Sequence, residues 1–304
     1  MSASPRILLL GAAGQLGAEL QRSFAGRGEI ISCTRDRVDL AAEDQLRSLV
    51  RDTAPSLILN AAAYTAVDKA ESEPELARSV NAIAPRILAE EALRNHTLLV
   101  HYSTDYVFDG SKTAPWSEDD QTRPLNVYGA SKLAGEEAIR QVGGRYLIFR
   151  TSWVYGPRGK NFLLTMLRLG QERDQLRVVD DQIGAPTSSA ALADATRAVI
   201  DAILGGPRES EPAWSGVYHM TCGGAVSWYG FAQAIFDRAH TMLNARVPAL
   251  APISSSEYRT PAQRPRNSVL SCEKLQRRFG VCLPDWQTAL DDVLRELSAR
   301  RIPA

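Results

Sequence analysis

The sequence has 304 residues, 44% of them hydrophobic, and its 35 Lys and Arg are balanced by 35 Asp and Glu. A chain of this length and apolar content can bury one large core, or a larger domain carrying a smaller one. With a net charge of zero, the chain has no net field of the kind that draws a protein to nucleic acid or to an anionic membrane. We therefore expect a small-molecule partner, with no nucleic acid and no membrane.

The four cysteines lack the spacing of a metal site or a redox motif. Cys33, Cys222, Cys272 and Cys282 include no C-x-x-C pair, and no histidine stands at ligand spacing from them. The apolar run at 7–10 is too short for a signal-peptide core or a membrane span. These features predict a cytoplasmic protein in a reducing compartment, with no metal site.

In the first half of the chain, short apolar runs typical of strands alternate with helix-length segments. The predicted strands are 7–10, 30–33, 57–60, 98–102 and 146–150, and the predicted helices are 15–24, 43–51, 75–93 and 128–142. Strands separated by helices form βαβ units, which build a parallel sheet covered on both faces. We predict an α/β fold with a Rossmann-type, doubly wound parallel sheet.

After residue 150 the alternation becomes irregular. Loops rich in Gly or Pro are expected at 156–159, 184–186, 205–212 and 261–265, and helices at 228–238 and 286–297. This pattern predicts a second, smaller α+β substrate domain interleaved with the last elements of the sheet. We expect the dinucleotide-binding domain in 1–155, with further elements near 176–220, and the smaller domain in 156–175 and 221–304.

A glycine-rich loop, GAAGQLG at 11–17, joins the first predicted strand to the first helix. In this setting Gly11 permits a tight turn, Gly14 lets the backbone approach a pyrophosphate, and the helix amino terminus supplies free N–H groups and partial positive charge. Spaced glycines alone more often mark a plain turn. Their position directly after the first strand favours a dinucleotide site.

The second predicted strand is followed by Thr34 and Arg35, where an acidic residue would bind the ribose 2′-hydroxyl of NADH. An arginine suits a 2′-phosphate, so we expect NADPH in preference to NADH, the alternative being an arginine that is merely solvated. Asp39 and Leu40 stand where they can reach the adenine, and the small residues at 60–63 leave room for the cofactor backbone.

Tyr128 and Lys132 are four residues apart, which places them one above the other on one face of a predicted helix. A neighbouring ammonium group stabilises a phenolate, so we expect Lys132 to lower the pKa of Tyr128 from about 10 toward neutral pH. Tyr128 can then exchange a proton with a carbonyl oxygen, and the hydroxyl of Thr104 can hydrogen-bond that oxygen. The Y-x-x-x-K spacing alone is also typical of a plain amphipathic helix; together with the glycine loop it predicts a catalytic set.

On these motifs the sequence resembles the extended short-chain dehydrogenase/reductases, and within them the reductases of nucleotide sugars. Seven segments carry the resemblance: 11–17, 60–73 (NAAAYTAVDKAESE), 101–109 (HYSTDYVFD), 124–135 (PLNVYGASKLAG), 149–156 (FRTSWVYG), 181–187 (DQIGAPT) and 264–268 (RPRNS). They span nearly the whole chain. The resemblance implies NADPH-dependent reduction of the 4-keto group of dTDP-4-dehydro-L-rhamnose, a step in supplying sugar for cell-surface polysaccharide.

The resemblance also implies roles for individual residues. It places Thr104 and Tyr128 at the reacting oxygen, Lys132 beneath the tyrosine and on the nicotinamide ribose, and Asp105 and Trp153 against the sugar. The residues implied along the cofactor are Gly14, Gln15, Leu16, Asp39, Leu40, Ala62, Ala63 and Thr65, beside Gly11 and Gly17 of the glycine loop. Two further arginines, Arg264 and Arg266, are candidates for a nucleotide diphosphate or, alternatively, are solvated.

Some members of this family are homodimers linked by Mg²⁺ through glutamates, one of which matches Glu19. Here the segment at 188–191 (SSAA), which follows GAPT, has no carboxylate. We therefore do not expect Mg²⁺ to bridge two subunits, and we expect a monomer or a weak homodimer.

Two other functions fit parts of the pattern. An NDP-sugar epimerase or dehydratase on this fold would hold NAD tightly, but a dehydratase commonly has acidic residues directly after the threonine, and here Asp105 is followed by Tyr106. A non-catalytic, NADP-binding regulatory subunit would need no proton donor, whereas Thr104, Tyr128 and Lys132 are all present.

Overall fold

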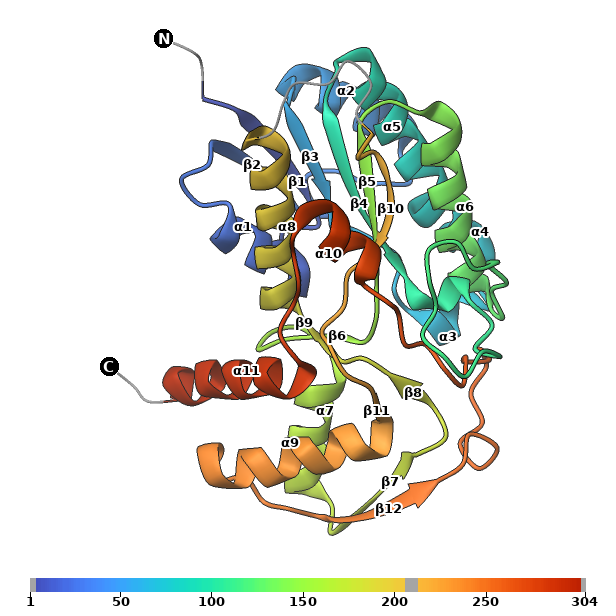
Figure 1. Cartoon of the computed structure of the whole chain (residues 1–304), viewed down its shortest axis with the longest axis vertical. Helices are drawn as coiled ribbons and strands as arrows, with labels where there is room; N and C mark the ends of the chain where they lie inside the picture. The colour runs from blue at the N-terminus through green and yellow to red at the C-terminus, as the bar shows by residue number, and fades with distance from the viewer. Residues whose placement is uncertain (1–3, 206–212, 302–304) are drawn as a thin grey trace.

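Six strands form one sheet in which every neighbouring pair is parallel (Figure 1). The computed structural model describes residues 4–205 and 213–301. In spatial order the strands are β10 (Gly216–His219), β5 (Tyr146–Thr151), β4 (Leu98–Thr104), β3 (Leu57–Asn60), β1 (Arg6–Leu10) and β2 (Glu29–Cys33). The order reverses at β1, so the predicted doubly wound fold is confirmed, and the five predicted strands match within two residues at each end.

Helices cover both faces of this sheet because its strands are apolar on both sides. On one face lie α1 (Gln15–Ser23), α8 (Ser189–Gly205) and α10 (Glu273–Phe279), and on the other α2 (Glu43–Thr53), α5 (Ala84–Arg94) and α6 (Val127–Val142). In β1, Ile7 and Leu9 point to the face covered by α1 and α8, and Leu8 and Leu10 point to the face covered by α2 and α5. A continuous apolar run, rather than an alternating one, is what a strand buried on both faces requires.

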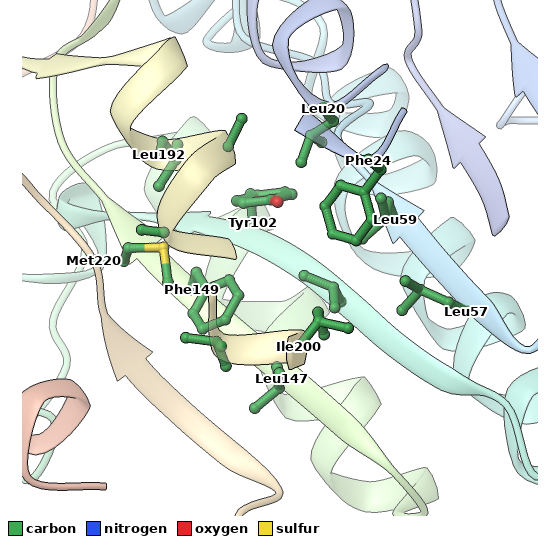
Figure 2. Close-up of a cluster of buried hydrophobic side chains, with 14 of the residues drawn as sticks. Leu20, Phe24, Leu57, Leu59, Tyr102, Leu147, Phe149, Leu192, Ile200 and Met220 are labelled. Atoms are coloured by element: carbon green, nitrogen blue, oxygen red, sulfur yellow. The ribbon is translucent and has the colours of Figure 1, made fainter. Parts of the chain in front are cut away.

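Figure 2 shows the core on the α1 and α8 face. Leu20 and Phe24 reach it from the α1 side, and Leu192 and Ile200 reach it from α8. Tyr102 of β4 lies in the same cluster and hydrogen-bonds Thr196 of α8 through its hydroxyl (2.9 Å), so the polar tip of this buried ring has a partner.

The segment predicted as one helix at 75–93 is not one continuous α-helix, because a π-helical turn interrupts it. After α3 (Val67–Ala70), helix α4 (Pro74–Arg78) runs into a π-helical turn, η1 (Ser79–Ile83), and then into α5. Pro85 has no N–H to donate to the carbonyl of Asn81, four residues earlier. Gly135 of α6 packs against that carbonyl, since a Cβ at Gly135 would lie 2.1 Å from the oxygen of Asn81.

A second core lies outside the six-stranded sheet, on α7 (Phe162–Glu172), α9 (Trp228–Leu243) and α11 (Trp286–Arg301). Three short pairings accompany it: β7 (Gln175–Val179) with β12 (Ala249–Ile253), β8 (Ile183–Gly184) with β11 (Val226–Ser227), and β6 (Val154–Tyr155) with β9 (Thr187–Ser188). The helices predicted at 228–238 and 286–297 are confirmed and extend further.

The division into a dinucleotide-binding domain and a smaller domain stays a prediction, and two elements depart from the bounds expected for them. One is α10, which falls in the range predicted for the smaller domain but packs on the six-stranded sheet. Of the further sheet elements expected near 176–220, α8 and β10 join the six-stranded sheet, but β7 pairs with β12 and packs into the second core. The loop predicted at 205–212 lies, apart from its first residue, outside the described residues. None of the helices among the described residues is long and apolar enough to cross a bilayer.

The contact between α6 and η1 yields a stability prediction. Gly135→Ala places a methyl group against the Asn81 carbonyl and should lower the free energy of unfolding by about 1–3 kcal/mol, because backbone on both sides must shift. Gly205→Ala is the matched control, since its methyl group meets open space at the end of α8. Chemical denaturation of the two variants measures the difference, and equal stabilities would contradict the packing described here.

Candidate active site

The carboxyl ends of the parallel strands carry most of the residues predicted to act. The glycine loop follows β1, Thr104 ends β4, and Tyr128 and Lys132 lie in the first two turns of α6. Asn126 caps α6 by accepting a hydrogen bond from Gly129 N (2.8 Å). A Cβ at Gly129 would lie 2.2 Å from the carbonyl oxygen of Tyr106, so glycine lets the Tyr128 turn sit against η2 (Asp105–Val107).

The glycine loop has the shape that a dinucleotide pyrophosphate requires. Gly11 has a φ of +77°, and a Cβ there would lie 2.7 Å from Ala62 N; a Cβ at Gly17 would lie 2.1 Å from Gly11 O. The first hydrogen bond of α1 runs from Ala18 N to Gly14 O (3.0 Å), so the amides before it point out of the helix end. The fit to a dinucleotide is therefore good.

The other residues predicted for the cofactor gather around this loop. Gln15 opens α1, and its side-chain oxygen accepts a hydrogen bond from Asn161 Nδ2 (2.8 Å), so the start of α7 closes over the helix end. Leu16 packs against the core on the α1 and α8 face of the sheet. Ala62, Ala63 and Thr65 follow β3 beside the loop.

At the adenine end, Arg35 is exposed just after β2. Its charge lies near enough to Lys69 to affect the pKa of that ammonium. Asp39 accepts a hydrogen bond from Ala41 N (3.0 Å), and Leu40 packs partly buried against the second sheet face. Two cations and a structured turn thus lie where a ribose phosphate is expected.

At the reacting end, Thr104 links two acidic groups. Its hydroxyl donates to the Asp105 carboxylate (2.9 Å) and is also hydrogen-bonded with the Tyr128 phenol. The ring of Tyr106 packs edge-on against that of Tyr128, with centroids 5.8 Å apart. The structure therefore brings together Thr104, Tyr128 and Asp105, as expected.

The expectation that Lys132 lowers the pKa of Tyr128 is wrong for this structure. Burial of the phenol group, although part of the ring stays accessible, raises its pKa to about 12, and the hydrogen bond with Thr104 lowers it only in part. The Lys132 ammonium turns instead to His101 on β4, with Nζ 3.2 Å from Nε2. Burial also lowers the pKa of Lys132 to about 8, against which the charge of Glu136 acts.

Asp105 is a buried carboxyl surrounded by hydroxyl groups. Burial raises its pKa to about 6, while hydrogen bonds from Ser268, Thr104 and Ser152 oppose the rise. The Ser152 hydroxyl lies 3.0 Å from the carboxylate. Ser268 lies in the loop between β12 and α10, and Ser152 directly follows β5. Asp105 therefore connects both parts of the chain.

Trp153 has a strained backbone and a stacked ring. Its φ is +47°, a left-handed conformation that is costly for a bulky residue. The indole lies nearly parallel to that of Trp228 at the start of α9, with centroids 3.5 Å apart, and a Cβ at Gly184 would lie 2.5 Å from the Trp153 ring. Trp153 is thus held between the two parts of the chain.

Two arginines considered for a diphosphate differ in their surroundings. Arg264 forms an ion pair with Asp68 (2.8 Å) and hydrogen-bonds Thr260, so it ties the 260–268 loop to α3. Arg266 contributes its backbone carbonyl, which accepts from Ile183 N (2.7 Å). A groove of about 470 Å³ lies elsewhere, between α8 and α11, and the residues predicted to act do not line it.

Several residues at the site have no signal in the sequence motifs. Asn81 of η1 accepts from Tyr64 N and donates to Ser131 Oγ, which joins the loop after β3 to α6. His101 contacts Lys132. It lies in the 101–109 segment, but nothing in that segment indicates this contact. In the part of the chain that is described, no three His, Cys, Asp or Glu side chains gather closely enough to hold a metal ion.

Comparison with known proteins shows similarity along the whole chain. A family model described as the RmlD substrate binding domain matches residues 5–299. A dTDP-4-dehydrorhamnose reductase of Burkholderia thailandensis is 48% identical over 295 residues, covering 96% of this chain and 99% of that protein. One from Escherichia coli K12 is 44% identical over 299 residues, covering 96% of this chain and 97% of that protein.

Solved structures show the same similarity. The crystal structure of a dTDP-4-dehydrorhamnose reductase from Bacillus anthracis in complex with NADP has a TM-score of 0.88 at 36% identity, covering 96% of this chain and 99% of that chain. A Thermus thermophilus UDP-glucose 4-epimerase complexed with NAD has a TM-score of 0.75 at 20% identity, covering 98% of this chain and 100% of that one, and is similar in fold alone.

The buried Asp105 carboxyl generates a prediction about pH. Its pKa is raised in the folded state, so the folded chain binds the extra proton between about pH 4 and 6 and gains stability as pH falls through that range. Relative to the wild type, Asp105→Asn should therefore be more stable at pH 8 than at pH 4.5, by about 2 kcal/mol.

Asp109→Asn is the matched control for urea denaturation at the two pH values. Hydrogen bonds from Ser111 lower the pKa of Asp109 below its usual value of about 4, so this carboxylate stays largely ionised at both pH values and its substitution should show little pH dependence. An equal pH dependence in the two variants would contradict the environment assigned to Asp105.

Proposed function

The chain belongs to the RmlD substrate binding domain family, and on this premise we propose that it is a dTDP-4-dehydrorhamnose reductase. In this proposal it uses NADPH, and less readily NADH, to reduce the 4-keto group of dTDP-4-dehydro-L-rhamnose to dTDP-L-rhamnose, a step toward cell-surface polysaccharide. The observation that carries the proposal is the meeting of Thr104, Tyr128 and Asp105 at the sheet edge that bears the glycine loop.

Tyr128 acts as the general acid. A ketone that accepts hydride on carbon needs a proton on oxygen, and a phenol with a pKa near 12 is protonated at neutral pH, the state required for reduction. The hydrogen bond between Tyr128 and Thr104 orients the phenol, and Thr104 is itself oriented by Asp105. Bound NADPH supplies the hydride.

The glycine loop holds the cofactor by its pyrophosphate, through the amides at the start of α1. Arg35 faces the 2′-phosphate, Ala62, Ala63 and Thr65 line the cofactor beside β3, and Lys132 reaches the nicotinamide ribose. The Bacillus anthracis relative, solved with NADP, supports this choice of cofactor.

On the substrate side, Asp105 and Trp153 contact the sugar. The Trp153 indole is half-buried and stacks on Trp228, so it offers a flat apolar surface that suits the apolar face of a sugar. Since Trp153 follows β5 of the sheet and Trp228 begins α9 of the second core, sugar binding at this stack involves both parts of the chain.

The same evidence bears on how the chain assembles. We propose a monomer or a weak homodimer without bridging Mg²⁺, because the Glu19 carboxylate is paired with Arg22 (2.8 Å) and 188–191 offers no carboxylate. We place the protein in the cytosol, a reducing compartment that suits its free thiols.

An epimerase would retain its nucleotide and consume no NADPH, whereas a reductase oxidises one NADPH for each sugar reduced.

The direct test is a spectrophotometric assay with dTDP-4-dehydro-L-rhamnose, comparing NADPH with NADH. We expect equimolar loss of NADPH absorbance and formation of dTDP-L-rhamnose. Turnover of the sugar without loss of NADPH would favour the epimerase instead, and binding of NADPH without any turnover would favour a regulatory subunit.

Tyr128→Phe tests the general acid. Removing the phenol hydroxyl should reduce kcat by about 10²–10⁴-fold and leave the Kd for NADPH nearly unchanged, because a proton donor is lost and not a binding surface. Tyr102→Phe is the matched control, as its hydroxyl bonds Thr196 on the α8 face of β4. Full activity in Tyr128→Phe would refute this assignment.

Arg35→Asp tests cofactor selection. The ratio of kcat/KM for NADPH to that for NADH should fall about tenfold or more, since a charge-assisted hydrogen bond is replaced by repulsion of the 2′-phosphate. Arg37→Asp, two residues along the same loop, is the control, because the Arg37 guanidinium turns back to Ser32 O (3.2 Å). An unchanged ratio in Arg35→Asp would remove this residue from the site.

A further inference from the structure

A layer of buried polar side chains separates α6 from the sheet. Four come from strands and two from α6: Asn60, His101, Ser103, Arg150, Lys132 and Glu136. Asn60 of β3 lies directly opposite His101 of β4, and Ser103 of β4 lies opposite Arg150 of β5, so the layer has two rows facing the helix. Lys132 and Glu136, one helical turn apart, meet the two rows.

The row of Ser103 and Arg150 forms an ion pair with Glu136. Arg150 donates to both oxygens of the Glu136 carboxylate (Nη2 to Oε2, 2.7 Å; Nε to Oε1, 2.9 Å), and Ser103 Oγ donates a third bond (2.5 Å). The hydrogen bonds of Glu136 are therefore made with Arg150 and Ser103, and its charge reaches Lys132 only through space. The ammonium needs a partner in the other row.

His101 is that partner, and the chemistry of the ammonium determines its tautomer. A lysine ammonium can only donate, so Nε2, at 3.2 Å, must carry a lone pair. Burial and the Lys132 charge hold the pKa of His101 well below its usual value, so the ring is neutral and its single proton is on Nδ1.

Asn60 completes the chain of hydrogen bonds. Its side-chain amide meets His101 Nδ1 at 3.0 Å, and its oxygen is buried without a partner when the amide nitrogen faces the ring. The amide oxygen and nitrogen occupy equivalent positions, and only the arrangement with the oxygen toward Nδ1–H gives the imidazole proton an acceptor. The chain then runs from Asn60 through neutral His101 to Lys132.

We propose that His101 is a positioning residue for catalysis: its neutral imidazole, oriented by Asn60, accepts a hydrogen bond from the Lys132 ammonium and fixes that group beneath Tyr128. The proposal rests on the proposed function, in which Lys132 reaches the nicotinamide ribose. With one N–H held by His101, the ammonium stays charged despite burial and keeps its other two N–H groups for the cofactor.

Two substitutions separate positioning from packing. His101→Gln places an amide oxygen where Nε2 lies and keeps the acceptor for Lys132. His101→Asn places its amide where Nδ1 lies, so it keeps the contact with Asn60 and loses the one with Lys132. Both variants replace the ring with an amide, so a defect caused only by lost packing should appear in both.

We expect His101→Asn to lower kcat about tenfold, as loss of one hydrogen bond to a charged group predicts, with KM for the sugar unchanged. The basic limb of its kcat–pH profile should move down by about one pH unit, because an ammonium without its acceptor loses its proton more easily. His101→Gln should restore both values. The other titratable groups around Lys132, namely Tyr128, Glu136, Arg150 and Asp105, are the same in both variants.

A spectroscopic measurement on the full-length protein with NADPH bound tests the contact without relying on turnover. Imidazole ¹⁵N shifts should show His101 with a protonated Nδ1 and a bare Nε2 that does not titrate around neutral pH, and Lys132→Met should change the Nε2 shift. A proton on Nε2, or titration of the ring near its usual pKa, overturns the proposal. Equal losses in the Gln and Asn variants without a shift of the pH limb do the same.

The outcomes also distinguish this proposal from the proposed function. A chain that shows the expected His101 tautomer but reduces no nucleotide sugar would contradict the reductase assignment alone. An active reductase whose His101 carries its proton on Nε2 would contradict the positioning role alone.

Discussion

The burial of one ammonium group, that of Lys132, constrains the structure around the site more than any other single interaction. Burying a cation costs free energy unless its neighbours accept its hydrogen bonds or carry the opposite charge, because desolvation favours the neutral amine. Here the sheet supplies a neutral acceptor in His101, and α6 supplies the negative charge of Glu136, already paired with Arg150. The polar layer under α6 therefore requires β3, β4, β5 and α6 to meet in one register.

The same burial divides the acid–base groups by function. Tyr128 and Lys132 are neighbours in sequence spacing, yet burial moves the pKa of the phenol up to about 12 and that of the ammonium down to about 8. The tyrosine is therefore a protonated donor, and the lysine is a cation whose pKa lies close to neutral pH. Thr104 and Asp105 complete a hydrogen-bonded line from the phenol to the loop that carries Ser268.

The two cores meet through a few strained or closely packed residues. Trp153 adopts a left-handed backbone conformation while its ring stacks on Trp228 from the second core and covers Gly184. Such strain persists only where the surroundings over-determine the conformation, and it gathers at functional sites. Together with the Arg264–Asp68 ion pair, this stack joins the loops after the sheet to the smaller domain.

The sequence by itself determined the elements and the chemistry of single motifs. Apolar runs and helix-length spacers specified the strands and helices of the doubly wound sheet, and the glycine spacing after β1 specified the loop shape, because these depend on neighbours within a few residues. The tertiary structure decided what depends on contacts across elements. Examples are the π-turn at Asn81 against Gly135, the pairing of β7 with β12, and the contact of the Lys132 ammonium with His101. Periodicity shows which side chains share a face of one helix or strand. Which faces meet, and how deeply a charge is buried between them, is set only when the whole chain packs.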